Sequence, residues 1–398
     1  MGGGLMQLVA YGAQDIYLTG NPQITFFKVV YRRHTNFSME SIKQTFDGTA
    51  NFGGSVSATI SRNGDLVHRM YLEHAMVFDQ DSKNTGLCER YGDSLIKECE
   101  IEIGGQRIDK HTSMWNRVWS DLTEFNPSGH FGASDSGGPV TASTLATGNG
   151  TLYQLMTGNG YGLNTEATVS GSLDFCAGGL VVNGFTYTDT STLDIGRIFL
   201  PLNFWFCRNP GLALPLIALQ YHEVKIKMTF ESKTNLARAV HASIGVGAAY
   251  TSGATDEGSP TFNLWCDYIY LDTDERRRFA QVSHEYLIEQ LQISENTITT
   301  GSPVIDLNFN HPVKELIWAT RCEGSNGRCS SIYDAVADDI TAGPVSLSGM
   351  AGNWLLKLNG HDRFKERDSK YFTRTQVWQH HTGYGALETV GNTIEPPN

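Results

Sequence analysis

Short runs of alternating apolar and polar residues recur along the chain and predict strands that bury one face and expose the other. These runs cover residues 56–61, 98–103, 224–230, 262–270, 305–310 and 356–358. Two of them end in residue pairs suited to two-residue hairpin turns, Gly104-Gly105 and Asn359-Gly360, because such turns need positive φ angles. The pattern therefore predicts a mainly antiparallel, all-β chain.

Helical spacing is rare in this chain. Trp115, Trp119 and Phe125 recur near helical intervals, which predicts a short helix that begins at residue 112 or 113 and stops before Pro127. We interpret this helix as a cover for the open end of a barrel rather than as a platform for a ligand. A second short helix is expected over residues 274–279.

One segment differs in composition from the rest of the chain. The 79 residues between Arg117 and Arg197 contain no lysine or arginine, hold 14 of the 42 glycines and carry −7 of the net charge of −12. The central part is rich in Ser, Thr, Gly and Asn, which predicts a long surface excursion over residues 127–184. Loops of this length are usually either functional or disordered. Further along, Pro210-Gly211 predicts a connection between two all-β halves.

Charge and cysteine content argue against several classes of protein. A net charge of −12 without a long basic run speaks against direct nucleic-acid binding, because phosphate neutralisation dominates such affinity. The cluster 276–278 of three arginines follows acidic residues, so we expect local ion pairs there. The longest apolar stretch, 212–219, is too short to span a membrane as a helix. Seven widely spaced cysteines favour free thiols in a reducing compartment, with a Cys322–Cys329 bridge left open.

Residues that could carry chemistry do not form a recognisable site in the sequence. Ser136 lies in an Asp-Ser-Gly-Gly-Pro motif that resembles the nucleophile segment of trypsin-like serine proteases. No upstream histidine stands in the context that such an enzyme needs for its base, so we interpret the motif as a turn. The pairs His222-Glu223, His284-Glu285 and His380-His381 lack the spacing of metal ligands. We therefore expect no catalytic, cofactor-binding or metal-binding residues.

Two Asn-X-Ser/Thr sequons are candidates for glycosylation. Asn149 stands in the expected excursion and is the candidate that we retain. Asn36 stands in a strand-like run and is expected to be inaccessible.

Distinctive blocks of sequence are spread over nearly the whole chain. They are residues 7–28 (QLVAYGAQDIYLTGNPQITFFK), 30–37 (VYRRHTNF), 214–224 (LPLIALQYHEV), 275–280 (ERRRFA), 284–290 (HEYLIEQ), and 358–364 (LNGHDRF) with 366–368 and 371–372. In this order they closely resemble the major capsid proteins of large icosahedral double-stranded DNA viruses, the phycodnavirus, iridovirus and marseillevirus group.

The resemblance implies two consecutive eight-stranded jelly-roll barrels in one subunit, with few short helices. Residues 1–24 would form an N-terminal arm, residues 25–210 the first barrel with the excursion 127–184, and residues 211–398 the second barrel. The resemblance leaves open whether the second barrel is complete. A barrel without its last strands would show unpaired edges and an exposed core, and a closed eight-stranded second barrel would exclude that possibility.

The resemblance also implies a structural, non-enzymatic protein that is made late and assembled in the host cytoplasm. It would form homotrimers and pseudo-hexagonal capsomers in the virion, beside neighbouring capsomers, minor capsid proteins and penton proteins. The arm would reach toward minor proteins or an internal membrane, and the excursion would face the host. No cofactor is implied. The alternative is a carbohydrate-binding jelly roll, which predicts exposed aromatic side chains in a concave groove and glycan affinity as a monomer.

Overall fold

The computed structural model describes a barrel and parts of the chain that follow it. The described residues are 36–79, 85–87, 91–124, 152–157, 173–176, 179–182, 192–239, 260–296, 304–319, 337–339, 343–345, 353–383, 388–390 and 393–395. The predictions for the arm 1–24, Ser136, Asn149 and the pair Cys322–Cys329 fall outside these residues. Within them, no helix has both the length and the apolar character needed to cross a membrane.

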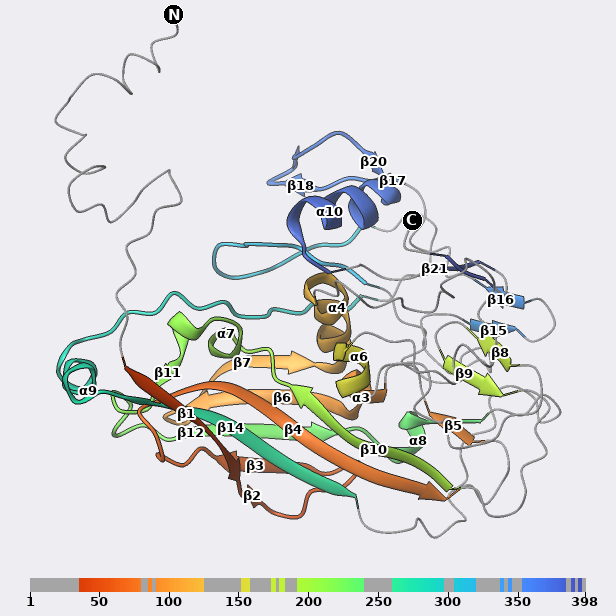
Figure 1. Cartoon of the computed structure of the whole chain (residues 1–398). Coiled ribbons are helices and arrows are strands. Elements are labelled where there is room, and N and C mark those ends of the chain that lie inside the picture. The colour runs from red at the N-terminus through yellow and green to blue at the C-terminus, as the bar shows by residue number, and fades with distance from the viewer. Residues whose placement is uncertain are drawn as a thin grey trace, which may run out of the picture.

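Two antiparallel five-stranded sheets face one another and form the barrel (Figure 1). The first sheet has the order β1-β14-β4-β10, and β11 also pairs with β4. Its strands are β1 (Phe37–Gln44), β4 (Leu66–Asp79), β10 (Thr192–Pro201), β11 (Leu214–Pro215) and β14 (Thr261–Leu271). The second sheet has the order β2-β3-β12-β6-β7. Its strands are β2 (Phe46–Asp47), β3 (Ser55–Thr59), β6 (Ile96–Ile103), β7 (Gln106–Thr112) and β12 (Val224–Phe230).

The order of these strands identifies the barrel as a jelly roll. Taking β2 with β3 and leaving out the short β11, the chain passes through β1, β3, β4, β6, β7, β10, β12 and β14. Counted in that order, the sheets read 1-8-3-6 and 2-7-4-5. This is the double Greek-key arrangement of an eight-stranded jelly roll. The barrel is complete within residues 37–271.

The boundary that the sequence analysis placed at 210/211 is wrong in the described structure. Both β12 and β14 follow that point, yet they pair with strands that precede it in each sheet. Pro210 instead opens a one-turn 3-10 helix, η1 (Pro210–Leu212), in which Asn209 Oδ1 accepts a hydrogen bond from the Gly211 backbone N–H at 2.9 Å. The Pro/Gly signal therefore marks a tight turn inside the barrel and not a connection between domains.

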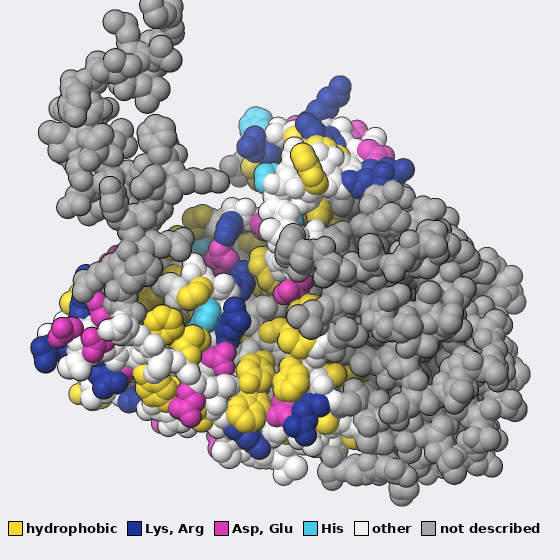
Figure 2. Space-filling view, viewed as in Figure 1, with side chains coloured by type: hydrophobic (Ala, Val, Ile, Leu, Met, Phe, Trp, Pro, Cys, Tyr) yellow, Lys and Arg dark blue, Asp and Glu magenta, His cyan; other side chains and the backbone are white. Residues whose placement is uncertain are grey.

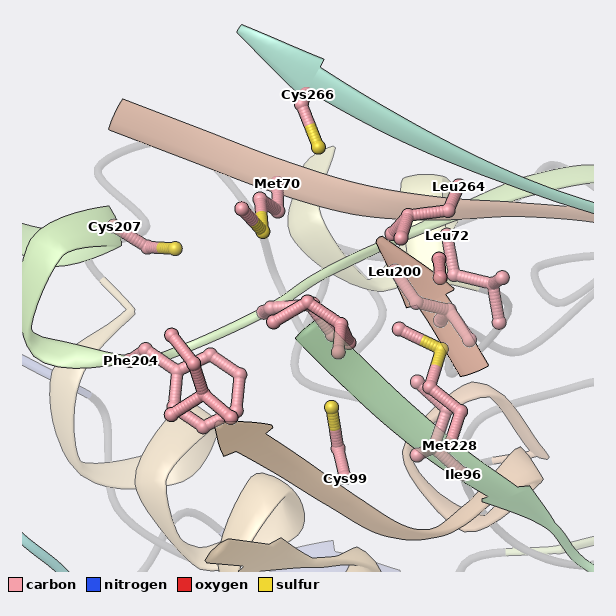
Figure 3. Packing of buried hydrophobic residues seen from close by; sticks show 14 of the residues in the cluster. Met70, Leu72, Ile96, Cys99, Leu200, Phe204, Cys207, Met228, Leu264 and Cys266 are labelled. Atoms are coloured by element: carbon pink, nitrogen blue, oxygen red, sulfur yellow. The ribbon is translucent and has the colours of Figure 1, made fainter. Parts of the chain in front are cut away.

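The hydrophobic core fills the space between the two sheets (Figure 3). Met70, Leu72 and Leu264 of the first sheet point toward Cys99 and Met228 of the second. The predicted alternation is confirmed in β3 and β12, whose apolar positions are buried between more exposed polar ones. In β14 it holds from Phe262 to Tyr268, with Trp265 at one of the partly exposed positions. Among the described residues, every buried side chain lies at or before Ile269.

Both predicted hairpin turns and both predicted helices are confirmed. Gly104 and Gly105 have φ angles of 61° and 82°, and Asn359 and Gly360 have φ angles of 51° and 80°. The tryptophan-bearing helix is α4 (Ser113–Thr123), which Thr112 caps, and the second helix is α9 (Thr273–Gln281). In Figure 1, α9 lies at the left end of the barrel and α4 lies above β6 and β7.

The strand predicted over residues 305–310 is wrong, because residues 304–319 form no β-ladder with described residues. Hydrogen bonds from a side chain hold this segment instead. The amide of Gln292 donates from Nε2 to the carbonyl oxygen of Asn310 at 2.6 Å and accepts from its backbone N–H at 2.9 Å. The side chain of Gln292 therefore joins residues 282–296 to residues 304–319, where the sequence predicted a β-strand.

The remaining described elements are short. Beside the barrel these are α3 (Tyr91–Leu95), α6 (Leu152–Thr157), α7 (Trp205–Arg208), α8 (Lys233–Leu236), β5 (Thr85–Leu87), β8 (Leu173–Cys176), β9 (Gly179–Val182) and β13 (Ala237–Ala239). After α9 come β15 (Ala337–Asp339), β16 (Gly343–Val345), β17 (Asn353–Trp354), β18 (Lys357–Leu358), β19 (His361–Asp362), β20 (Arg367–Asp368), a π-helix η4 (Tyr371–Gln376), α10 (Val377–His380), β21 (Glu388–Val390) and β22 (Thr393–Glu395). The second jelly roll is not formed by these residues and stays a prediction.

Candidate assembly surfaces

The residues that could carry chemistry are dispersed or inert in the described structure. No three histidine, cysteine, aspartate or glutamate side chains gather to hold a metal ion among the described residues. Cys99, Cys207 and Cys266 are buried free thiols. Burial raises the pKa of Cys207 to about 12 and also raises the pKa of the other two thiols. None of the three is therefore a thiolate nucleophile at neutral pH.

The paired histidines noted in the sequence occupy structural positions. His284 donates a hydrogen bond from Nε2 to the backbone carbonyl oxygen of Phe279 at 2.8 Å. Its imidazole also stacks on the phenyl ring of Phe279. His381 Nε2 lies 2.5 Å from Oε1 of Glu315. These contacts join neighbouring segments of the fold. Asn36, expected to be inaccessible, lies directly before β1 and is exposed, as are the first five residues of that strand.

A buried carboxylate anchors helix α9 on the barrel. Asp65 accepts hydrogen bonds from Nε and Nη2 of Arg276 at 3.1 and 3.0 Å, and from the backbone N–H of Leu271 at 2.9 Å. Asp272 caps the helix by accepting from the Thr273 backbone N–H at 2.7 Å. The prediction of a local partner for Arg276 is therefore wrong, because the carboxylate that it binds, Asp65, lies 211 positions away in the chain. The first turn of α9 faces the loop before β4, which brings the two residues together.

The segment that follows α9, residues 282–296, covers the open edge of β7; we call it the connector. Gln290 donates from Nε2 to the carbonyl oxygen of Ile108 at 2.6 Å. The backbone N–H of Leu291 donates to Oδ1 of Asp109 at 3.0 Å. Since β7 is the last strand of its sheet, the bond from Gln290 satisfies one backbone carbonyl of that strand, and the bond from Leu291 holds the connector against its side chains.

Glu289 ties the connector to two other parts of the chain. Its carboxylate lies 3.1 Å from Nη1 of Arg208 in α7 and also accepts a hydrogen bond from the ammonium group of Lys314. The hydrogen bond from Lys314 and the charge of Arg208 lower the pKa of Glu289 despite its partial burial. The carboxylate is therefore ionised at neutral pH and joins the barrel, the connector and residues 304–319.

The outer face of the second sheet is lined with ion pairs, and we call it the charged face. Its residues stand on β6, β7 and β12 and are Glu98, Glu100, Glu102, Arg107, Lys110, Lys225 and Lys227. Lys110 Nζ lies 2.9 Å from Glu98, and Lys227 Nζ lies 2.5 Å from Glu102. Opposite charges on adjacent strands stabilise this face while it stays in contact with water.

The outer face of the first sheet is different, and we call it the aromatic face: Phe37, Met39, Tyr71, Phe199 and Trp265. The rings of Tyr71 and Trp265 stack with centroids 6.4 Å apart, and Phe199 meets Tyr71 edge-on at 6.0 Å. Hydrophobic side chains stand out between charged ones over this sheet in Figure 2. These are positions at which alternation predicts polar residues.

A buried carboxylate holds the centre of the aromatic face in place. Glu73 Oε2 accepts hydrogen bonds from Trp265 Nε1 at 2.7 Å and from Asn263 Nδ2 at 3.1 Å. Arg197 Nη1 lies 3.0 Å from Oε1 of the same carboxylate. Burial alone would raise the pKa of Glu73, but these hydrogen bonds and the charges of Arg197 and Lys43 lower it. The indole of Trp265 is therefore held in one orientation.

Comparison with known proteins identifies the family. The sequence pattern of the major capsid protein N-terminus matches residues 25–272, and that of the large eukaryotic DNA virus major capsid protein matches residues 275–385. The chain belongs to the major capsid protein family of large eukaryotic DNA viruses. It is a structural protein of a viral capsid, as the sequence resemblance implied. The boundary between the two patterns falls at the junction of β14 and α9, where the barrel ends.

Relatives of this capsid protein match it over most of its length. The major capsid protein of Pyramimonas orientalis virus is 49% identical over 386 residues, which cover 96% of this chain and 76% of the relative. The major capsid protein of Paramecium bursaria Chlorella virus 1 (PBCV-1) is 39% identical, and the match covers 95% of this chain and 78% of the relative. The structure of PBCV-1 VP54, fitted into a cryo-EM reconstruction of the virophage Sputnik, aligns with a TM-score of 0.58 and 35% identity over 91% of this chain and 78% of that one. The quasi-atomic PBCV-1 virus capsid aligns with a TM-score of 0.56 and 32% identity over 89% of this chain and 77% of that one.

The family blocks map onto the junctions described above. Block 214–224 spans β11 and the turn into β12, block 275–280 lies in α9 with Arg276, and block 284–290 lies in the connector with Glu289. Their partners Asp65, Ile108 and Arg208 were missed, because each lies far away in the sequence and no local pattern marks it. The aromatic face was missed as well, although Trp265 at a predicted polar position of its strand was a usable signal.

Proposed function

We propose that this capsid protein forms homotrimers that act as pseudo-hexagonal capsomers of an icosahedral shell, each subunit contributing two barrels. The first barrel would comprise residues 37–271 and the second would begin after α9. The observation that carries the proposal is the match of both capsid sequence patterns, in order, on either side of the point where the first barrel ends. Two barrels in each of three subunits give six similar units around a threefold axis.

Sedimentation velocity of the purified full chain, followed by electron microscopy of concentrated samples, tests this proposal. We expect a stable trimer and hexagonal arrays. A chain that stays monomeric at every concentration, or that forms only dimers, would contradict it.

We further propose that the protein has no catalytic activity. The support is its membership of the major capsid protein family, whose relatives are named for a structural role in the capsid. A fluorophosphonate probe that labels Ser136 would refute this.

The remaining expectations concern partners and place. We propose that the arm 1–24 contacts minor capsid proteins or an internal membrane, that the excursion 127–184 faces the host with a glycan on Asn149, and that assembly takes place in the host cytoplasm beside neighbouring capsomers and penton proteins. Mass spectrometry of protein from virions would reveal the glycan. Cross-linking in virions would identify the neighbours of the arm.

A further inference from the structure

Helix α4 lies outside the barrel strands, yet it is covered on more than one side. In Figure 1 it stands between β6 and β7 below it and α10 above it. No side chain of α4 that the structure describes is exposed. A helix on the surface of a barrel keeps one face in water unless a further layer packs on it. Residues outside the barrel strands therefore cover the face of α4 that β6 and β7 leave free.

A distant part of the chain binds the last carbonyl groups of α4. A helix leaves its last four carbonyls without partners of its own. The backbone N–H of Gly383 donates to the carbonyl oxygen of Leu122 at 2.8 Å, and Thr382 Oγ1 donates to that of Thr123 at 2.7 Å. Thr382 stands 259 positions after Thr123. The end of α4 is therefore completed by the residues that follow α10.

Arg208 joins the side of α4 to the connector. It is the last residue of α7, whose other three residues are buried. The central carbon of its guanidinium lies 4.8 Å from the centre of the Trp119 ring, and Nη1 lies 3.1 Å from Oε2 of Glu289. A planar guanidinium can stack on an aromatic ring and bind a carboxylate with its edge at the same time. Arg208 therefore holds Trp119 of α4 and Glu289 of the connector with one group.

A column of rings fixes Trp119 on the barrel. Trp119 stacks on Trp115 with the ring centroids 5.0 Å apart, and Trp115 lies 6.0 Å from the ring of His111 on β7. His111 is buried. The column runs from the second sheet through α4 to Arg208, so the guanidinium has a defined place relative to the barrel.

We propose that α4 and α7 form a platform that fixes the chain after α9 on the first barrel, with Arg208 as the positioning residue. The partner that this surface fits is the second half of the same copy, since Glu289, Thr382 and Gly383 contact it in the single subunit. The consequence for assembly rests on the proposed capsomer. Six barrels can surround a threefold axis only if the two barrels of each subunit keep one relative position.

Hydrogen–deuterium exchange of the full chain tests the role of Arg208. Arg208→Gln removes the stacking and the charge, and Glu289 keeps Lys314 as a partner, so no buried charge is left alone and the variant should fold. Exchange in α4 and the connector should rise about tenfold, while exchange in β12 stays unchanged. Arg197→Gln is the matched control, because Arg197 pairs with Glu73 inside the first sheet at 3.0 Å and should leave α4 unchanged.

Two results of this experiment would overturn the proposal. One is unchanged exchange in α4 of folded Arg208→Gln protein, with folding checked by circular dichroism. The other is an equal rise in α4 and β12, which would mean that Arg208 only stabilises the barrel. Sedimentation velocity then measures the consequence: the dissociation constant of the assembly should rise about tenfold in Arg208→Gln. An unchanged constant would refute the positioning role.

Thr382→Ala tests whether the two contacts hold one platform. This exposed substitution removes the hydrogen bond to the carbonyl of Thr123 and should also raise exchange at the end of α4. In Arg208→Gln/Thr382→Ala, exchange should rise by less than the product of the two single factors, because each substitution already loosens the same unit. A rise equal to the product would show two independent contacts and contradict the proposal.

A cross-linking experiment identifies the copy that covers α4. A benzophenone amino acid at position 382, in a mixture of isotopically light and heavy full-length chains, should cross-link to α4 within one copy. Cross-links between light and heavy chains would show that a second copy covers α4, which would overturn the proposal and leave the capsomer intact. Cross-links within a chain that stays monomeric would support the platform and refute the capsomer, so the two proposals can fail separately.

Discussion

Lowering the pH should destabilise the barrel through one buried histidine. His74 on β4 is fully buried. Its Nδ1 lies 3.0 Å from the carbonyl oxygen of Thr261, and its Nε2 lies 2.8 Å from the hydroxyl of Tyr91. Since a carbonyl can only accept, Nδ1 carries the proton and Nε2 accepts from Tyr91, which satisfies the neutral ring completely. Burial lowers the pKa of His74 from 6.5 to about 4, against a smaller opposing effect of the Thr261 hydrogen bond.

The sign and size of the effect follow from linkage. Between pH 6.5 and 4 the unfolded chain binds a proton at His74 that the folded chain does not, so stability falls as the pH falls through this window. A difference of about 2.5 pKa units corresponds to about 3.4 kcal/mol in full, of which about 2 kcal/mol is lost between pH 7 and pH 5. Above pH 7 the contribution of this residue is constant.

Urea unfolding at pH 5, 6 and 7 measures the effect. His74→Gln should cost about 1–3 kcal/mol at pH 7, because it disturbs buried hydrogen bonds, but it should remove about 2 kcal/mol of the decline toward pH 5. His222→Gln, at an exposed position, is the control and should keep the wild-type slope. Equal slopes in wild type and His74→Gln, or a His74 ring that titrates by NMR near pH 6.5, would refute the reasoning.

Two further substitutions test other parts of the structure by urea unfolding. Gly105 has a φ of 82° and open space around its Cα, so Gly105→Ala should cost about 1 kcal/mol from backbone strain alone, and Gly105→Asn about half as much; equal costs would mean that φ is not the cause. Arg276→Ala should cost about 1–2 kcal/mol because Asp65 stays buried without its guanidinium partner, and adding Asp65→Asn should recover part of that loss. A fully additive double variant would contradict the pairing.

Local features of this fold could be predicted because they depend on neighbours in the sequence. The alternation in β3 and β12, the Gly104-Gly105 turn and the cap of α4 at Thr112 all follow from residues within one or two turns of each other. For the same reason, Pro210-Gly211 was wrongly interpreted as a boundary between domains. A turn signal carries no information about whether the strands on its two sides share a sheet.

Features that depend on contacts between residues far apart in the sequence could not be predicted. Phe37 of β1 lies opposite Leu271 of β14, so the first and last strands of the barrel are neighbours, and no periodicity reports that. The contact of Arg276 with Asp65 joins residues 211 positions apart in the chain. The composition of the aromatic face was visible, since Trp265 interrupts a polar series, but its meaning required the sheet order that brings Tyr71 and Phe199 beside it.

The described residues after α9 leave their apolar side chains exposed or only partly buried. After α9, the ring of Trp318 lies 5.4 Å from that of Trp354 and 5.2 Å from that of Phe372, measured between centroids. Even so, no described residue beyond Ile269 is buried. Val304 and Trp378 are largely exposed in the same part of the chain. Apolar surface of this extent is unfavourable in water and is stabilised when another surface covers it. Among the described residues, the buried side chains therefore all belong to the first barrel and its immediate surroundings, and the apolar groups after α9 are those that a covering surface would stabilise.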